Sequence, residues 1–158
     1  MKQIVTIIAC IIITEALGFT VGMLTREGTR IYADTMVKPP LSPQALLFPI
    51  AWTLLYALMG TGVAMIINSE SSGVRTLGIA LYLAQLFFNL AWCFIFFTFK
   101  NYGGALVWII ILLILVVFMT IMFYRISRVA GLIQIPYILW LLFATYLNAG
   151  VMVLNKGG

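Results

Sequence analysis

The stretch LLFPIAWTLLYALMGTGVAMII, residues 46–67, contains no charged side chain over its whole length. A helix needs about 20 mostly apolar residues to cross a bilayer. Four further stretches have this character, at about residues 4–24, 77–99, 105–124 and 132–154. Strands of a membrane β-barrel would be about half as long and would alternate in polarity, which none of these does. The sequence therefore predicts an all-α integral membrane protein, in which residues 1–158 form a single bundle of five transmembrane helices.

The composition supports the same conclusion. Hydrophobic residues make up 64% of the chain and charged residues 8%, with a mean hydropathy of +1.15. A soluble domain carries roughly a quarter charged residues, so the lipid bilayer is the expected solvent and partner. The net charge of +5 suits contact with anionic lipid. The basic residues are scattered at the ends of the apolar runs, which argues against a nucleic-acid partner.

The longest polar segment, TREGTRIYADTMVKPPLSPQA at residues 25–45, joins the first two predicted helices. We expect it to be a lid loop, stiffened by prolines that each fix a backbone angle. Ser42 followed by Pro43 predicts a helix start, with Ser42 as the N-cap. The alternative is a plain interfacial connector whose basic residues touch lipid headgroups. These basic residues are Arg26, Arg30 and Lys38.

Three predicted helices place aromatic and amide side chains on one face. The faces comprise Trp52, Tyr56 and Met59 in the second helix; Gln85, Asn89, Trp92 and Phe96 in the third; and Pro136, Trp140, Ala144 and Asn148 in the fifth. If these faces point inward, they would line an apolar pocket with a few hydrogen-bonding groups. The alternatives are that a Trp anchors the membrane interface and that the amides hold helices together.

Glu15 lies in the middle of the first apolar run. That run follows Lys2 but is too long for a typical signal-peptide core, so we expect a spanning helix. An intramembrane acid is a functional hypothesis by default, and a transporter could exchange protons against cations there. The alternative is a protonated acid hydrogen-bonded to a neighbouring helix. The chain has no histidine and no conventional catalytic constellation, so we expect no metal site and no required cofactor.

Five collinear motifs resemble the translocator protein family, also called tryptophan-rich sensory proteins or peripheral benzodiazepine receptors. The motifs are GTRIYADTMVKPP (28–40), AWTLLYALMG (51–60), ALYLAQLFFNLAWCFIFF (80–97), GGALV (103–107) and PYILWLLFATYLN (136–148). The resemblance covers nearly the whole chain. It implies a five-helix bundle in a bacterial-type cell membrane, frequently a homodimer. It also implies a pocket that opens toward the loop between the first two helices.

The resemblance implies the ligands and the residues that bind them. Expected ligands are porphyrins, with protoporphyrin IX foremost, and drug-like benzodiazepine or isoquinoline-carboxamide compounds. Ala149 and Val153 stand where the family's sterol motif has a tyrosine and a basic residue, which argues against sterol binding by that motif. The expected ligand-binding residues are Tyr32, Pro43, Trp52, Leu55, Tyr56, Gln85, Asn89, Trp92, Phe96, Trp140, Phe143, Ala144 and Leu147.

The function hypothesis is a membrane-embedded porphyrin sensor or scavenger. Arg26, Arg30 and Lys38 would bind the propionates, and Trp52 and Trp140 would support light-dependent oxidative breakdown of the pigment. Whether the protein is an enzyme in this sense stays open. The first alternative is a small-molecule transporter that uses Glu15, and the second is a structural or partner-binding membrane subunit.

Overall fold

A computed structural model describes residues 1–155, and helices account for most of that length. The prediction of five spanning helices is confirmed. The spans are α1 (Lys2–Leu24), α3 (Leu47–Ile67), α4 (Gly73–Cys93) continued by a π-helix η1 (Phe94–Thr98), α5 (Tyr102–Ile126), and α6 (Arg128–Leu132) followed by α7 (Ile135–Leu154). The predicted boundaries of all five spans agree with these to within about four residues, but the break in the fifth span was not predicted.

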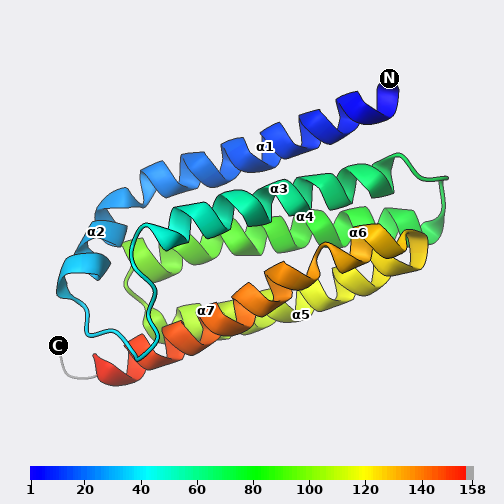
Figure 1. The fold of residues 1–158 in the computed structure, drawn as a ribbon. Coiled ribbons are helices and arrows are strands. Elements are labelled where there is room, and N and C mark those ends of the chain that lie inside the picture. The colour runs from blue at the N-terminus through cyan, green and yellow to red at the C-terminus, as the bar shows by residue number, and fades with distance from the viewer. Residues whose placement is uncertain (156–158) are drawn as a thin grey trace.

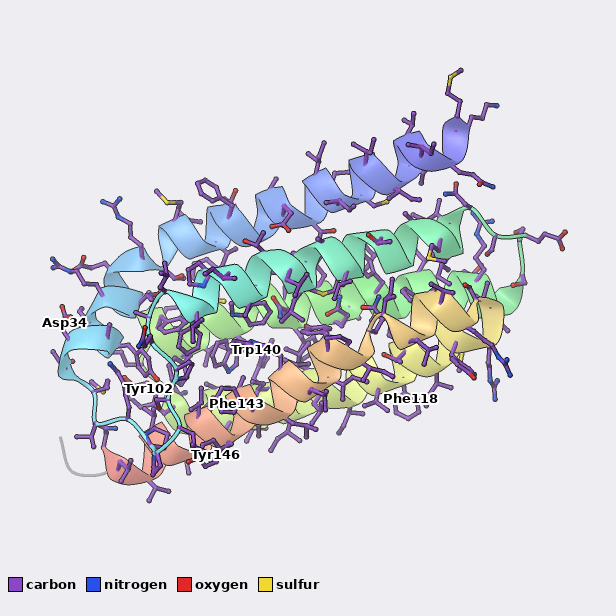
Figure 2. All side chains as sticks on the ribbon, in the orientation of Figure 1. Asp34, Tyr102, Phe118, Trp140, Phe143 and Tyr146 are labelled. Carbon is purple, nitrogen blue, oxygen red and sulfur yellow. The ribbon has the colours of Figure 1, made fainter. Side chains whose placement is uncertain are left out.

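The helices form a bundle in which α1 lies on the outside (Figure 1). α1 packs chiefly on α3, α4 on α5, and α5 on α7. The core lies among α3, α4, α5 and α7, where Met59, Met119 and Tyr137 are fully buried. Large apolar side chains cover the outer surface, as Phe118 of α5 shows by pointing away from the bundle (Figure 2). An apolar outer surface of this kind is what contact with the lipid bilayer requires.

Glycines bring α1 and α3 into close contact. A Cβ placed on Gly60 would lie 2.7 Å from the Ile11 Cα and 2.9 Å from the Cys10 carbonyl oxygen. A Cβ on Gly18 would lie 2.1 Å from the Tyr56 ring. Small residues at such crossings let helix backbones approach, which drives helix association in membranes. Gly18 therefore serves an intramolecular contact in this chain.

The segment at residues 25–45, which we expected to be a proline-stiffened lid loop, is partly helical, because residues Arg26–Thr35 form helix α2. The helix is amphipathic: Thr29, Tyr32 and Ala33 face the bundle, and Glu27 and Arg30 form an exposed ion pair at 3.0 Å. Thr25 joins the two helices as the C-cap of α1 and the N-cap of α2. Gly28 allows α2 to dock on η1, since a Cβ there would lie 2.3 Å from the Phe97 carbonyl oxygen.

The predicted helix start at Ser42 and Pro43 is wrong. α3 begins at Leu47, and the Ser42 hydroxyl instead donates to the Pro39 carbonyl oxygen at 2.7 Å. Pro49, not Pro43, occupies the first turn, where its missing N–H costs no intrahelical hydrogen bond. Leu41, between the prolines, has a φ of 66°, a left-handed conformation that keeps the segment out of a helix.

Residues 36–46 form a strap that crosses the end of α7 and returns to α3 (Figure 1). The Asn155 side chain accepts from the Val37 N–H at 3.1 Å and donates to the Val37 carbonyl oxygen at 3.0 Å. The Tyr146 hydroxyl donates to the Pro40 carbonyl oxygen at 2.8 Å. Pro39 is buried against Gly150, where an added Cβ would lie 2.5 Å from the Pro39 Cβ. The strap is therefore fixed to α7.

Candidate ligand cavity

A cavity of about 520 Å³ lies between α1, α2, the strap and the facing sides of α3, α4 and α7. Ligand sites in proteins typically enclose about 300–1,000 Å³ and are mostly apolar with a few placed polar groups. The wall of this cavity is predominantly apolar, with Glu15, Arg26 and Lys38 as its charged residues. Its size and chemistry therefore suit a hydrophobic ligand with a polar end.

One continuous face of α1 and α2 supplies the first wall. Glu15, Gly18 and Gly22 recur at helical spacing, and Arg26 and Thr29 continue the same face beyond the bend at Thr25. A Cβ on Gly22 would meet no atom within 4 Å, so the wall is open at that point. Gly18 thus allows α1 to pack on α3, whereas Gly22 leaves space in the cavity.

Aromatic side chains from three elements supply the opposite wall. The Trp52 ring stacks on Tyr56 with centroids 5.4 Å apart and meets Trp140 edge-on at 6.2 Å. Trp92 stacks on Phe96 at 4.8 Å, and its indole N–H donates to the Asn148 side chain at 3.2 Å. In Figure 2 Trp140 and Phe143 lie in succession along α7. The indoles are held by ring contacts and leave their remaining surfaces to the cavity.

Many of the predicted site residues line this cavity. They are Tyr32, Pro43, Trp52, Tyr56, Trp92, Trp140 and Ala144, together with Arg26 and Lys38. Phe96 and Leu147 border a small recess that shares Tyr32, Trp92 and Ala144 with the cavity. Residues that lie as far apart as Arg26 and Ala144 in the sequence therefore share one surface.

Other predicted site residues are not on the cavity wall. Leu55 is buried in the core. Phe143 packs between Trp140 and Tyr146, with ring centroids at 5.9 and 6.3 Å. Arg30 is exposed and pairs with Glu27 on the outer side of α2, so it does not reach the cavity. Helix periodicity alone does not separate a wall residue from the residue behind it.

Gln85 and Asn89 are also absent from the wall, because their amides are used inside the bundle. The Tyr56 hydroxyl donates to the Asn89 oxygen at 2.8 Å, and the Asn89 nitrogen donates to the Tyr137 oxygen at 2.9 Å. The Tyr137 hydroxyl in turn donates to the Gln85 oxygen at 2.9 Å. Here the alternative interpretation holds: the amides join α3, α4 and α7. Tyr56 is the one member of this network that also lines the cavity.

We call the end of the cavity beside α2 and the strap its mouth, because Arg26 and Lys38 are exposed there. This end is basic and aromatic. The Lys38 ammonium lies 5.5 Å from the centre of the Tyr32 ring and donates to the Ala33 carbonyl oxygen. Burial, and secondarily the neighbouring Tyr102, raise the pKa of the Tyr32 phenol above its ordinary value, so it stays neutral at physiological pH. Lys38 and the exposed Arg26 are therefore the groups at the mouth that can meet an anion.

Several wall residues were missed by sequence reasoning. Phe48 and Phe97 line the cavity beside the tryptophans, and Thr29 lines it from α2. The spacing of Thr25, Thr29 and Tyr32 was a usable signal for Thr29, had the polar segment been tested for helical periodicity. Phe97 belongs to η1, and π-helices are rare and frequently occur at functional sites. No sequence signal for that irregularity was evident.

Comparison with known proteins finds relatives over nearly the whole chain. Residues 10–154 match the model of the TspO/MBR family. The chain is 36% identical to the tryptophan-rich protein TspO of Chlorobaculum tepidum, with 98% of each chain covered. It is 35% identical to a tryptophan-rich sensory protein of Cereibacter sphaeroides, over 77% of this chain and 75% of the relative. It is 33% identical to the human translocator protein, over 92% of this chain and 88% of the relative. This chain is an integral membrane protein that belongs to the TspO/MBR family.

Proposed function

We propose that the protein is a membrane-embedded sensor or scavenger that binds tetrapyrroles in the cavity between α1, α2 and α7. The observation that carries this proposal is the wall itself, where Trp52, Trp92 and Trp140 line an apolar space whose mouth holds two basic residues. One similar protein is named a tryptophan-rich sensory protein, which supports a sensory role.

A free-base porphyrin such as protoporphyrin IX matches this chemistry. Its flat aromatic disc would stack on the indoles, and its two propionates would pair with Arg26 and Lys38 at the mouth. Arg30 is not assigned a propionate, because it pairs with Glu27 on the outer side of α2. The same wall would accept drug-like benzodiazepine or isoquinoline-carboxamide ligands, which are flat and largely apolar.

The first test is a titration of the detergent-solubilised protein with protoporphyrin IX in the dark. Quenching of tryptophan fluorescence reports the binding. We expect saturable binding that weakens at least tenfold in the Arg26→Gln/Lys38→Gln double variant. Arg30→Gln is the matched control, since it removes a positive charge from the same helix outside the cavity. Absence of saturable binding by the wild type would overturn the proposal.

Light-dependent pigment loss is a second activity that the geometry favours, because Trp52 and Trp140 lie 6.2 Å apart on the wall. An excited porphyrin passes its energy to dioxygen, and the reactive oxygen formed attacks the pigment or a nearby oxidisable indole. The chemistry would belong to the pigment, while the protein confines it and supplies electron-rich rings.

The same titration under illumination tests this activity. We expect pigment loss to disappear in Trp52→Phe/Trp140→Phe while dark binding remains. Trp108→Phe is the control, since Trp108 lies outside the cavity and donates to the Phe88 carbonyl oxygen at 2.8 Å. Equal pigment loss in the wild type and in both variants would exclude a role for the Trp52 and Trp140 indoles and would leave binding as the function.

A further inference from the structure

Glu15 is a charged residue of the cavity wall that tetrapyrrole binding does not use. It lies in the interior of α1 (Lys2–Leu24), and its side chain is partly accessible from the cavity. Within residues 1–155 its carboxylate forms no hydrogen bond or ion pair, and the acid that does form an ion pair there is Glu27. An ionisable group at membrane depth without a protein partner requires one from elsewhere.

The basic residues of the cavity do not supply that partner. Arg26 follows Glu15 by eleven positions, which corresponds to about 16 Å of helix at 1.5 Å per residue. Lys38 lies at the same end as Arg26, where it donates to the Ala33 carbonyl oxygen. The cavity therefore has basic residues at its mouth and an acidic residue at a distance from them along α1.

The surroundings of Glu15 suit a cation. Gly18, one turn further along the same face of α1, is in direct contact with the Tyr56 ring. Tyr56 in turn stacks on Trp52. Electron-rich aromatic faces attract ammonium and other organic cations, and this attraction is larger where water is excluded. Glu15, Tyr56 and Trp52 line the same cavity, and a carboxylate that shares a surface with aromatic rings is a combination that recognises a positive charge on a hydrophobic body.

We infer that the inner part of the cavity binds hydrophobic organic cations, with Glu15 as counter-ion and Tyr56 and Trp52 as aromatic contacts. The ligand class is an aromatic or bulky apolar molecule that carries a positively charged nitrogen or phosphorus centre. The inference shares with the proposed function the premise that this cavity is a ligand site. It adds a specificity determinant at the end opposite to the propionate partners, and it requires no transport step.

A pair of probes that share a shape and differ in the sign of a permanent charge tests the inference. Tetraphenylphosphonium is the cation and tetraphenylborate is the anion. Binding of each to the purified protein in non-ionic detergent is followed by tryptophan fluorescence. The variants are Glu15→Gln, Glu15→Asp and the control Glu27→Gln, which changes the net charge equally but lies outside the cavity.

We expect saturable tetraphenylphosphonium binding that weakens at least tenfold in Glu15→Gln and is largely kept in Glu15→Asp and Glu27→Gln. Tetraphenylborate binding should not weaken in Glu15→Gln, which also shows that this variant is folded. The inference is overturned if the wild type shows no saturable cation binding. Unchanged cation affinity in Glu15→Gln, or equal losses in Glu15→Gln and Glu15→Asp, would also overturn it.

A parallel protoporphyrin IX titration separates this inference from the proposed function. If the wild type binds protoporphyrin IX but not tetraphenylphosphonium, the role of Glu15 in cation binding is overturned and the tetrapyrrole proposal stands. Glu15-dependent cation binding without porphyrin binding supports the inference and removes the tetrapyrrole proposal.

Discussion

Asn89 shows at the scale of a single residue how the bundle separates packing from binding. Its side chain is 2% exposed and joins the Tyr56 and Tyr137 hydroxyls, so it bridges three helices. A buried amide without partners would be costly in this apolar interior, and here both of its polar atoms are satisfied. Tyr56 carries the effect to the cavity, because its ring is part of the wall. Asn89 therefore positions a wall residue without itself reaching the cavity.

We expect Asn89→Ala to lower the free energy of unfolding by about 1–3 kcal/mol, since it leaves two buried phenol groups with fewer partners. Thermal and denaturant unfolding in detergent measure this loss. Ser71→Ala, in the exposed turn before α4, is the control and should be neutral. An Asn89→Ala variant as stable as the control would mean that water or the neighbouring side chains replace the amide.

The elements show where sequence reasoning succeeded and where it failed. The five spans were predictable because a helix needs about 20 apolar residues to cross a bilayer, and apolar runs of this length are visible in the sequence. Helix α2 was missed because its polarity was taken as a sign of a loop, although Thr25, Thr29 and Tyr32 have helical spacing. The start of α3 was misplaced because the Ser42–Pro43 signal is local, whereas the strap is held by contacts with α7.

The break in the fifth span and the π-helix were also not predicted from the sequence. The fifth span is interrupted between α6 and α7, where the Gln134 side chain donates to the Leu58 carbonyl oxygen at 3.2 Å. Gly62 makes room for that side chain, since a Cβ there would lie 2.1 Å from the Gln134 nitrogen. A contact between α3 and a residue far along the chain cannot be inferred from either segment alone. Hydrophobic patterning therefore predicts spans better than it predicts their irregularities.

The α1–α3 contact leads to a prediction about helix packing. Gly60→Val would place side-chain atoms against the backbone of α1 at Ile11, which cannot move aside as a flexible side chain would. We expect a loss of about 1–3 kcal/mol in unfolding free energy, the usual cost of overpacking. Gly73→Ala is the control, because a Cβ there meets no atom within 4 Å. Equal stability of the two variants would show that α1 is free to shift away from α3.

The strap gives a prediction about ligand release. Asn155→Ala combined with Tyr146→Phe removes hydrogen bonds that hold Val37 and Pro40 to α7. Each of the three bonds contributes about 0.5–1.5 kcal/mol, so we expect protoporphyrin IX to dissociate at least about tenfold faster without them. Stopped-flow fluorescence measures this rate. Leu142→Ala on the exposed side of α7 is the control, and identical rates in both proteins would show that the strap does not gate release.

For the whole molecule, the main asymmetry is in burial: α1 has fewer buried residues than the other spans. Only Thr14 and Val21 are buried along α1, whereas α3, α4, α5 and α7 each contribute several residues to the core. α1 nevertheless supplies, together with α2, one wall of the cavity, including Glu15. The span with the fewest buried residues is therefore the one whose second half, from Glu15 onward, a ligand would touch. Elements with few buried contacts open locally at low free energy, and a ligand that binds the closed form stabilises them.

This asymmetry predicts how ligand binding changes the dynamics of the molecule. Hydrogen exchange measured by mass spectrometry in detergent should be fastest in α1 and α2, apart from the chain ends, and slow in α5. Protoporphyrin IX should slow exchange in α1 and α2 more than in α5, because the cavity borders the former and not the latter. In the Arg26→Gln/Lys38→Gln variant this protection should decrease in proportion to the lost affinity. Uniform protection of all spans would instead indicate that the ligand acts through global stability, and protection confined to α5 would place the ligand on a surface other than this cavity.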